Sequence, residues 1–260
     1  MPKSLLIIIL LFISINLQAQ TWEIGGSIGG SGYMGDLNPN NPVKLSGISA
    51  SGFVKRNFNR YLALRLNYTY GDIQGNDANS SNQQFRDRNL NFYTGLSEVA
   101  LIGEFNFMEY LPNVSNNRYT PFIFLGIGTV RYNPQADYGG QRYDLRPLTT
   151  EGETKQYSKS AYSIPYGVGI KYNISGKWNI IADLGYRNPN TDYLDDVSRN
   201  YPDPAKLPSN LARILSNRSS TNSNDLIGTQ RGDGRNRDTY MFLQFTVSFT
   251  FVTQKCYFEE

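Results

Sequence analysis

The main pattern in the chain is an alternation of apolar and polar residues with a period of two. In Tyr240 to Phe251, large apolar residues occupy every second position from Met241, and polar residues alternate with them from Gln244 on. This period is typical of a strand with one apolar and one polar face. At about 3.3 Å per residue and a tilt of about 40°, the segment covers roughly 25 Å along a membrane normal, close to the apolar band of an outer-membrane barrel. A sheet packed on a soluble core shows the same alternation, so the choice between a membrane barrel and a soluble fold depends on the other segments.

Seven more segments are predicted strands. They cover residues 22–34, 43–54, 61–70, 92–110, 119–132, 161–172 and 178–186. Segment 119–132 is apolar on both faces, so its pattern does not show which side faces inward. Ser209 to Asn217 is predicted to be a short helix capped by Ser209. No repeat of 20 to 50 residues is present, which disfavours a propeller or a solenoid.

The lengths of the links support a membrane barrel independently of hydropathy. If the first strand rises from the periplasm, the links after the second, fourth and sixth strands are periplasmic and short, while the other four are external and mostly long. This asymmetry is known for outer-membrane barrels, and eight strands can close without an unpaired edge. The sequence therefore predicts an all-β fold: an eight-stranded antiparallel transmembrane β-barrel with long extracellular loops and short periplasmic turns.

The first 20 residues have the features of a secretory signal peptide. Lys3 precedes an apolar run from Leu5 to Leu17, and Gln18-Ala19-Gln20 provides a small residue at the cleavage point. About 13 apolar residues fall short of the roughly 20 that a membrane helix needs, which argues against the alternative of an uncleaved anchor. We therefore expect a signal peptide at 1–20, a barrel in the outer membrane at 21–252 and a periplasmic tail at 253–260.

The amino-acid composition excludes several classes of function. The chain has 24 glycines, 19 tyrosines and 14 phenylalanines, and tyrosines collect at the two membrane interfaces of barrels. Histidine is absent, which removes Ser-His and Cys-His catalytic pairs and imidazole metal ligands. The net charge of +3 gives no support for nucleic-acid binding. We expect a non-enzymatic protein in contact with outer-membrane lipid, without a cofactor or a metal site.

Polar side chains on the inward face are predicted to form a polar network inside the barrel. An eight-stranded barrel leaves room only for side chains, so we interpret this network as a packed plug; the alternative is a conducting pore. Glu98 and Glu104 lie on one strand roughly 20 Å apart, too far for a catalytic pair. The members of the network are Glu23, Arg65, Glu98, Glu104, Lys171, Asp183 and Gln244.

Each of two charged motifs has both a structural and a functional interpretation. Arg231-Gly232-Asp233 is a tripeptide of some adhesion ligands, but its setting among turn residues favours turn chemistry. The acidic residues Asp192, Asp195 and Asp196 suit a hard cation, yet they lack a calcium-loop spacing, so capping and surface charge are the favoured interpretation.

Several motifs together resemble the PorG family, the outer-membrane barrel component of the type IX secretion system of Bacteroidetes. They are P-Y-G-V-G-I-K-Y-N-I-S-G-K-W-N at 165–179, Y-M-G-D-L-N at 33–38 and R-G-D-G-R-N-R-D-T-Y-M-F at 231–242. The most specific part is the segment Thr191, Asp192, Tyr193, Leu194, Asp195, Asp196, Val197 and Ser198, called the TDYLDDVS segment below. The resemblance spans nearly the whole mature chain, and it assigns no catalytic or ligand residue.

The resemblance implies a barrel that anchors or organises a periplasmic ring of PorK-type lipoprotein and PorN-type subunits for protein secretion and gliding motility. The alternatives are a general outer-membrane adhesin or porin-like barrel, a soluble lipid-carrying β-barrel and, disfavoured by the absence of histidine, an outer-membrane acyl-transfer or hydrolytic enzyme. If the last strand descends, the tail emerges in the oxidising periplasm, where Cys256 has no partner cysteine in its own chain. We expect Lys255, Cys256, Tyr257 and Phe258 to dock on the ring, with an intermolecular disulfide through Cys256 as one form of that contact.

Overall fold

A computed structural model describes residues 21–112 and 115–251 of the 260-residue chain. The expected signal peptide and periplasmic tail lie outside the described residues. Among the residues that are described, no helix is both long and apolar enough to cross a membrane.

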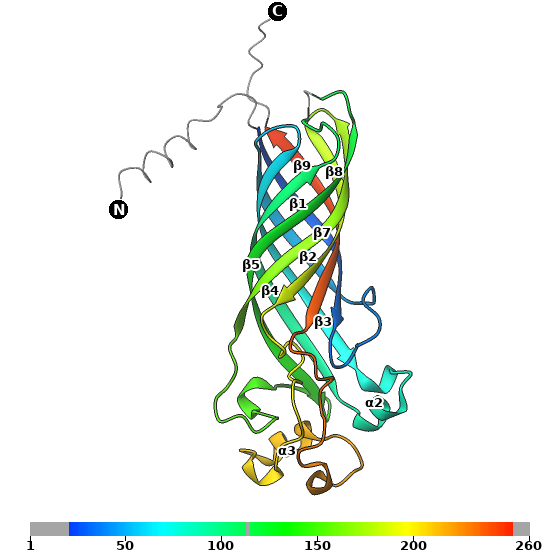
Figure 1. Cartoon of the computed structure of the whole chain (residues 1–260), viewed down its shortest axis with the longest axis vertical. Coiled ribbons are helices and arrows are strands. Elements are labelled where there is room, and N and C mark those ends of the chain that lie inside the picture. Colours follow the sequence, from blue (N-terminus) through cyan, green and yellow to red (C-terminus); the bar gives the residue numbers. More distant parts are fainter. Residues whose placement is uncertain (1–20, 113–114, 252–260) are drawn as a thin grey trace, which may run out of the picture.

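Eight long antiparallel strands close into a barrel (Figure 1). Each strand pairs with its neighbour along the chain, and β1 pairs with β9 to complete the circle, as in the pair Ile28 and Phe245. The closed fold confirms the sequence prediction. The strands are β1 (Thr21–Met34), β2 (Leu45–Asn57), β3 (Leu62–Asn76), β4 (Asn91–Asn106), β5 (Tyr119–Tyr138), β7 (Ser160–Ser175), β8 (Trp178–Pro189) and β9 (Thr239–Phe251).

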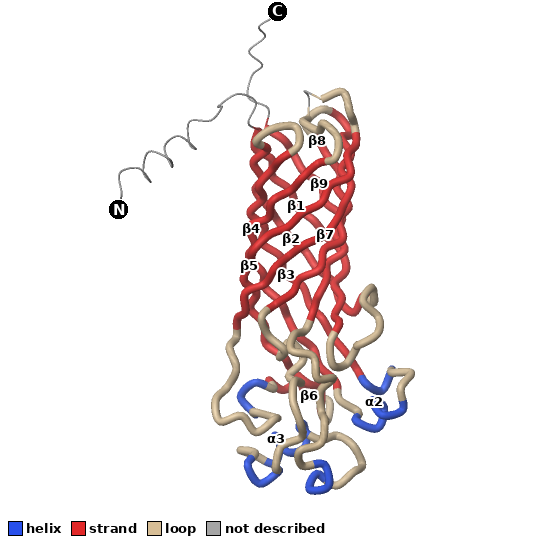
Figure 2. Tube along the Cα trace, in the orientation of Figure 1, coloured by secondary structure: helices blue, strands red, loops and turns tan. Residues whose placement is uncertain are grey.

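The two ends of the barrel differ. The links after β2, β4 and β7 lie at one end, together with the start of β1 and the end of β9 (Figure 1). The other four links lie at the opposite end, where they carry the short helices α2 (Gln83–Arg88) and α3 (Asn210–Ser216) (Figure 2). The Ser209 side chain accepts a hydrogen bond from the Ala212 N–H at 3.0 Å, which confirms the predicted cap.

An apolar belt covers the outside of the barrel. Each of the eight strands contributes an aliphatic residue that is between 43% and 75% exposed. A surface this apolar on every side suits hydrocarbon and not water. Exposed aromatic residues flank it: Trp22, Trp178 and Tyr119 towards the short-link end, and Tyr70 and Tyr162 towards the other. The belt includes Ile28, Ile48, Leu66, Leu101, Ile127, Val168, Ile180 and Val247.

Aromatic side chains fill the middle of the barrel. Phe122 and Phe124 of β5 point inward and pack with Phe53 of β2 and Ile181 of β8. Ile123 and Ile127 of β5 are exposed on the outside. The packing inside the closed barrel therefore settles the inward face of β5, which the sequence pattern left open.

Several predicted boundaries were wrong. The second strand was predicted to end at residue 54, but β2 continues to Asn57 and buries Lys55 inside the barrel. The fourth strand ends at Asn106 and not at Tyr110. β3 and β5 extend beyond their apolar segments into polar sequence, because backbone pairing continues past the lipid belt, and a short strand β6 (Gln141–Asp144) pairs with the end of β5. Helix α2 was also not predicted.

Candidate functional site

Eight buried charged side chains lie on the inward faces of the strands. Each is at most 3% exposed, and the four acids balance the four bases. The six charged residues predicted for the interior are all among them, together with Lys55 and Arg187, which the sequence analysis missed. Gln244, also predicted to face inward, is 3% exposed. The eight are Glu23, Glu98, Glu104, Asp183, Lys55, Arg65, Lys171 and Arg187.

Glu104 is the centre of the ion network nearer the short-link end. Its carboxylate lies 2.6 Å from Lys171 Nζ, 3.2 Å from Arg65 Nε and 3.6 Å from Lys55 Nζ. Lys55 Nζ also lies 2.9 Å from Glu23 Oε1, so two acids and three bases form one connected group. Ion pairing of this kind offsets the cost of removing each charge from water.

Glu98 belongs to a second group nearer the long-link end. Its carboxylate lies 3.4 Å from Arg187 Nε and accepts a hydrogen bond from the Tyr240 hydroxyl at 2.5 Å. Glu98 and Glu104 therefore have separate partners. Both carboxylate oxygens of Asp183 are buried without a hydrogen-bond partner among the described residues. The low exposure of these side chains supports a packed polar plug.

The links after β1, β3, β5 and β8 fold together into a mouth module over one end of the barrel (Figure 2). The module consists of residues 35–44, 77–90, 139–159 and 190–238. Its side chains share an apolar cluster with the ends of the strands: Tyr33, Leu37, Ile73, Leu90, Phe92, Leu96, Val130, Tyr132, Leu194, Val197, Tyr240 and Phe242. The links at this end therefore form a structured cap on the barrel.

The TDYLDDVS segment lies at the centre of this cap. Leu194 is fully buried; its carbonyl accepts a hydrogen bond from Thr94 Oγ1 of β4 at 2.6 Å, and its N–H donates to Asp238 at 2.9 Å. Thr191 Oγ1 lies 2.9 Å from the Tyr132 hydroxyl of β5. The segment thus bonds directly to the barrel wall, which gives it a structural role that the sequence did not reveal.

The acidic residues of the TDYLDDVS segment are buried. Asp192 is 8% exposed, and Asp195 and Asp196 are each 2% exposed, so the prediction of surface charge was wrong. Burial raises the pKa of Asp192 to about 6 and that of Asp196 to about 7. The sequence analysis assigned these aspartates to the surface because the local sequence of an acidic loop does not show which side chains become buried when the loop packs on the rest of the protein.

Asp196 has specific partners on another link. Its carboxylate accepts hydrogen bonds from the hydroxyls of Thr150 and Tyr157, the latter at 2.6 Å. The Tyr157 ring stacks on Tyr193 with centroids 4.4 Å apart and an interplanar angle of 9°. Asp196 and Tyr193 are thereby fixed against the link that joins β6 to β7.

Two buried arginines hold the module together. Arg231 Nη1 donates to Glu151 at 2.8 Å and to the carbonyl of Asp196 at 2.8 Å. Arg88 pairs with Asp77 at 2.7 Å and donates to the carbonyls of Arg231 at 2.7 Å and Asp36 at 2.9 Å. These contacts link all four segments of the module.

The Arg231-Gly232-Asp233 tripeptide does not present an arginine at the surface. The Arg231 side chain is 2% exposed in its ion pair with Glu151. An adhesion ligand needs an accessible guanidinium, so the structure argues against that interpretation. The favoured turn interpretation agrees with the 3.0 Å and 2.8 Å hydrogen bonds from the N–H groups of Arg231 and Gly232 to the Arg199 carbonyl.

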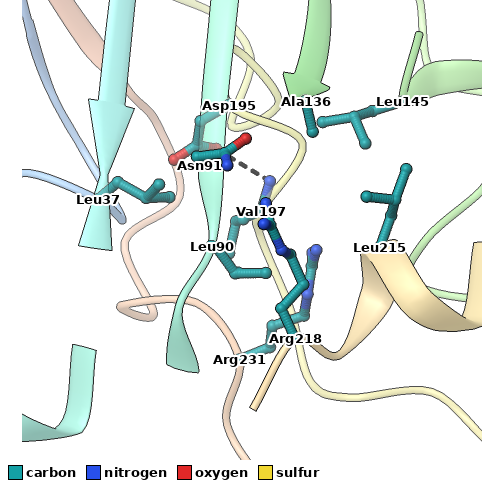
Figure 3. A pocket seen from close by; sticks show the side chains of 10 residues that line it. All are labelled: Leu37, Leu90, Asn91, Ala136, Leu145, Asp195, Val197, Leu215, Arg218 and Arg231. Carbon is teal, nitrogen blue, oxygen red and sulfur yellow. Dashed lines mark hydrogen bonds between the residues drawn. The ribbon is translucent and has the colours of Figure 1, made fainter. Parts of the chain in front are cut away.

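The module encloses little free space. A cavity of about 10 Å³ lies between the barrel mouth and α3, with Leu90, Val197 and Leu215 on its apolar side and Arg231 on its polar side (Figure 3). This volume holds about one water molecule. A larger, polar depression of about 460 Å³ lies at the ends of β3 and β4, lined by Lys44, Gln74, Asn76, Tyr93 and Asp137 among others.

The closed barrel and its apolar belt define a transmembrane β-barrel of the outer-membrane type. The chain belongs to the family described as "Domain of unknown function (DUF6089)", whose model matches residues 2–208. No curated protein sequence matches the chain significantly.

Similar solved structures are small outer-membrane proteins with low sequence identity. Neisserial surface protein A has 10% identity and a TM-score of 0.41, with 90% of this chain and 98% of that chain covered. The N-terminal barrel domain of Pseudomonas aeruginosa OprF has 12% identity and a TM-score of 0.38, with coverage of 90% and 98%. Ail of Yersinia pestis, crystallised with the heparin analogue sucrose octasulfate, has 12% identity and a TM-score of 0.39, with coverage of 89% and 97%. None of these similarities bears on function.

Proposed function

We propose that this barrel is a non-enzymatic outer-membrane anchor of a protein-secretion machine, with a role like that of the PorG family. The proposal depends mainly on the TDYLDDVS segment, which carries the resemblance in the sequence and lies at the centre of the mouth module. The buried, charge-balanced interior also favours a structural role over conduction, because fixed ion pairs occupy the space that a pore would need.

The arrangement of the two barrel ends supports one orientation. Short links are typical of the periplasmic end, and here they lie at the end where β1 begins and β9 ends. Placed this way, the tail after Phe251 enters the periplasm and the mouth module faces outward. PorK-type lipoprotein and PorN-type ring subunits would then meet the tail and the short links.

Within this proposal, the tail is the docking element. Lys255, Cys256, Tyr257 and Phe258 lie outside the described residues, so the argument for them is their sequence: one cation and two aromatic residues around a cysteine. Aromatic residues are enriched at protein interfaces. A cysteine without a partner in its own chain can form a disulfide with another protein in an oxidising compartment.

Purification from outer membranes in mild detergent tests the anchoring role. The full chain should co-elute with the lipoprotein and ring subunits, whereas a general adhesin or porin-like barrel would elute without them. Deletion of residues 253–260 should reduce co-elution if the tail docks; co-elution unchanged by the deletion would assign docking to the short links instead. On non-reducing gels, a shifted band that persists in Cys256→Ser would eliminate the disulfide.

A further inference from the structure

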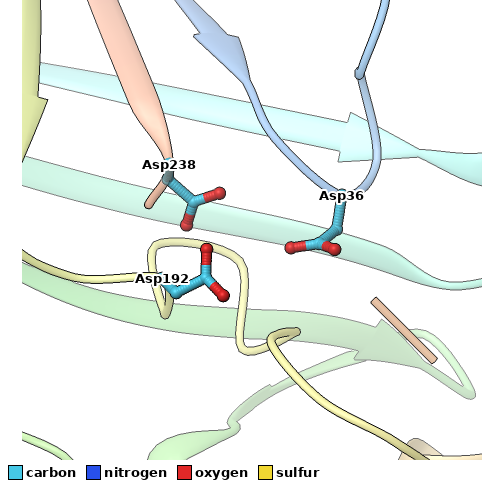
Figure 4. Close-up of side chains that lie close together, drawn as sticks. All are labelled: Asp36, Asp192 and Asp238. Carbon is cyan, nitrogen blue, oxygen red and sulfur yellow. The ribbon is translucent and has the colours of Figure 1, made fainter. Parts of the chain in front are cut away.

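Three buried carboxylates from separate pieces of chain meet inside the mouth module. Asp36 belongs to the link after β1, Asp192 to the TDYLDDVS segment, and Asp238 immediately precedes β9. One oxygen from each lies within 4.8 Å of the others. The side chains face one another across a common space (Figure 4). Asp36 is 1% exposed and Asp238 is fully buried.

No basic side chain forms an ion pair with these acids within the described part of the chain. Elsewhere in the module, Asp77 pairs with Arg88 and Glu151 pairs with Arg231. Arg88 reaches the backbone carbonyl of Asp36 and not its carboxylate. Three clustered carboxylates without an ion-pair partner repel one another when they are ionised at low dielectric, so a positive ligand at this position would remove an unfavourable energy.

A second observation indicates where a ligand would bind. Asp36 Oδ1 accepts a hydrogen bond from the Asp233 N–H, but Asp36 Oδ2 is buried and has no hydrogen-bond partner among the described residues. Buried polar atoms in folded proteins almost always have a partner, and an unpaired one calls for an explanation such as an ion. Asp238 is held in place by two hydrogen bonds: it accepts from the Leu194 N–H at 2.9 Å and from the Tyr33 hydroxyl at 3.3 Å.

We propose that Asp36, Asp192 and Asp238 bind one Ca²⁺ ion. Carboxylate oxygens are the ligands that Ca²⁺ prefers, whereas Zn²⁺ favours nitrogen and sulfur. Oxygens within 4.8 Å of one another fit around one ion at Ca–O distances of about 2.3–2.6 Å, and the remaining positions can take water or backbone carbonyls. Mg²⁺ suits the set less well, because it demands near-ideal octahedral geometry at about 2.0–2.1 Å.

The ion would tie the link after β1, the TDYLDDVS segment and the start of β9 together. Asp192 and Asp238 lie near the two ends of the β8–β9 link, which is the longest in the barrel. Binding here would therefore lock the cap over the barrel mouth. This inference holds whether or not the barrel serves a secretion machine.

The test uses the whole mature protein, refolded in detergent and treated with a chelator, with CaCl₂ titrated by calorimetry. We expect one site of the millimolar or sub-millimolar class that is common in extracellular calcium modules. Asp36→Asn and Asp192→Asn should each weaken binding by about tenfold or more, since affinity follows the ligand charge count. Asp225→Asn, an exposed acid in the same β8–β9 link, is the matched control and should bind like wild type.

Thermal unfolding supplies a second measurement. Added CaCl₂ should raise the melting temperature of wild type and of Asp225→Asn, but not that of Asp36→Asn or Asp192→Asn. Folding of each variant is checked by the heat-dependent mobility of the barrel on gels. If the wild-type protein binds no Ca²⁺ at 10 mM CaCl₂, the proposal is wrong, and protonation of the acids would explain their burial instead. Equal Ca²⁺ binding by wild type and both cluster variants would also overturn the proposal.

Discussion

Arg231 and Glu151 form an ion pair that is 2.8 Å long and buried, although 80 residues separate them in the chain. Arg231 comes from the β8–β9 link and Glu151 from the link between β6 and β7. Glu151 Oε1 also accepts hydrogen bonds from the N–H groups of Ser198 and Arg199, at 2.9 Å and 3.1 Å. The pair thus fixes the end of the TDYLDDVS segment to a second link.

Replacement of Arg231 should therefore loosen the mouth module without opening the barrel. Arg231→Met leaves Glu151 buried and uncompensated, and breaking a buried pair in this way costs about 3–5 kcal/mol. We expect faster protease cleavage within residues 190–238 and unchanged heat-dependent mobility on gels. Arg235→Met, which alters an arginine that is 48% exposed, should behave like wild type. Equal protease resistance of the two variants would contradict a structural role for the pair.

The mouth module should become less stable as pH rises. Burial raises the pKa of Asp196 to about 7, against the opposing effects of Arg231 and the hydroxyls of Thr150 and Tyr157, while Glu151 adds to the rise. Between about pH 4 and pH 7 the unfolded chain loses a proton that folded Asp196 retains, so the free energy of unfolding falls across this window.

Near-ultraviolet circular dichroism of the stacked tyrosines measures this dependence locally. The ring of Tyr157 stacks on Tyr193 and lies 6.4 Å from Tyr132. In the presence of a chelator, the signal of wild type should melt at a lower temperature at pH 8 than at pH 5. Asp196→Asn, which cannot ionise, should show a smaller difference between the two pH values. A melting temperature that rises with pH would contradict the assigned direction.

The barrel interior should depend on Glu104 more than on any exposed acid. Glu104→Gln removes the negative charge that Lys55, Arg65 and Lys171 share. We therefore expect a loss of about 3–5 kcal/mol in the free energy of unfolding. Glu109→Gln removes an acid that is 44% exposed and pairs with Arg60, and it should cost less than about 1 kcal/mol. Urea unfolding in lipid vesicles compares the two; equal losses would refute the central role of Glu104.

The barrel was predictable because the alternation that exposes one face to lipid also marks the other as interior. Glu23, Glu98 and Lys171 were assigned inward on that basis alone. Lys55 was missed because the run from Lys55 to Arg60 has the composition of a turn. Arg187 was missed because it precedes Asn188-Pro189, which reads as the end of a strand.

The mouth module was not predictable from pattern. Its links have no periodicity, and their acids have the same local composition as solvent-exposed loops. Asp36 and Asp238 are 202 positions apart and meet only because β1 and β9 are neighbours in the closed barrel. A resemblance identified the TDYLDDVS segment as distinctive, but tertiary packing was needed to explain Leu194 and Asp196.

The most direct test of the account is whether the apolar belt lies in a lipid bilayer on every side of the barrel. Single cysteines are placed at Ile28, Leu101, Val168 and Val247, on β1, β4, β7 and β9, with Cys256→Ser as background; Asn224→Cys in the exposed β8–β9 link is the control. In vesicles, a membrane-impermeant maleimide should label only position 224, and all five should react after denaturation. Labelling of the strand positions in intact vesicles as fast as position 224 would contradict a membrane-spanning barrel.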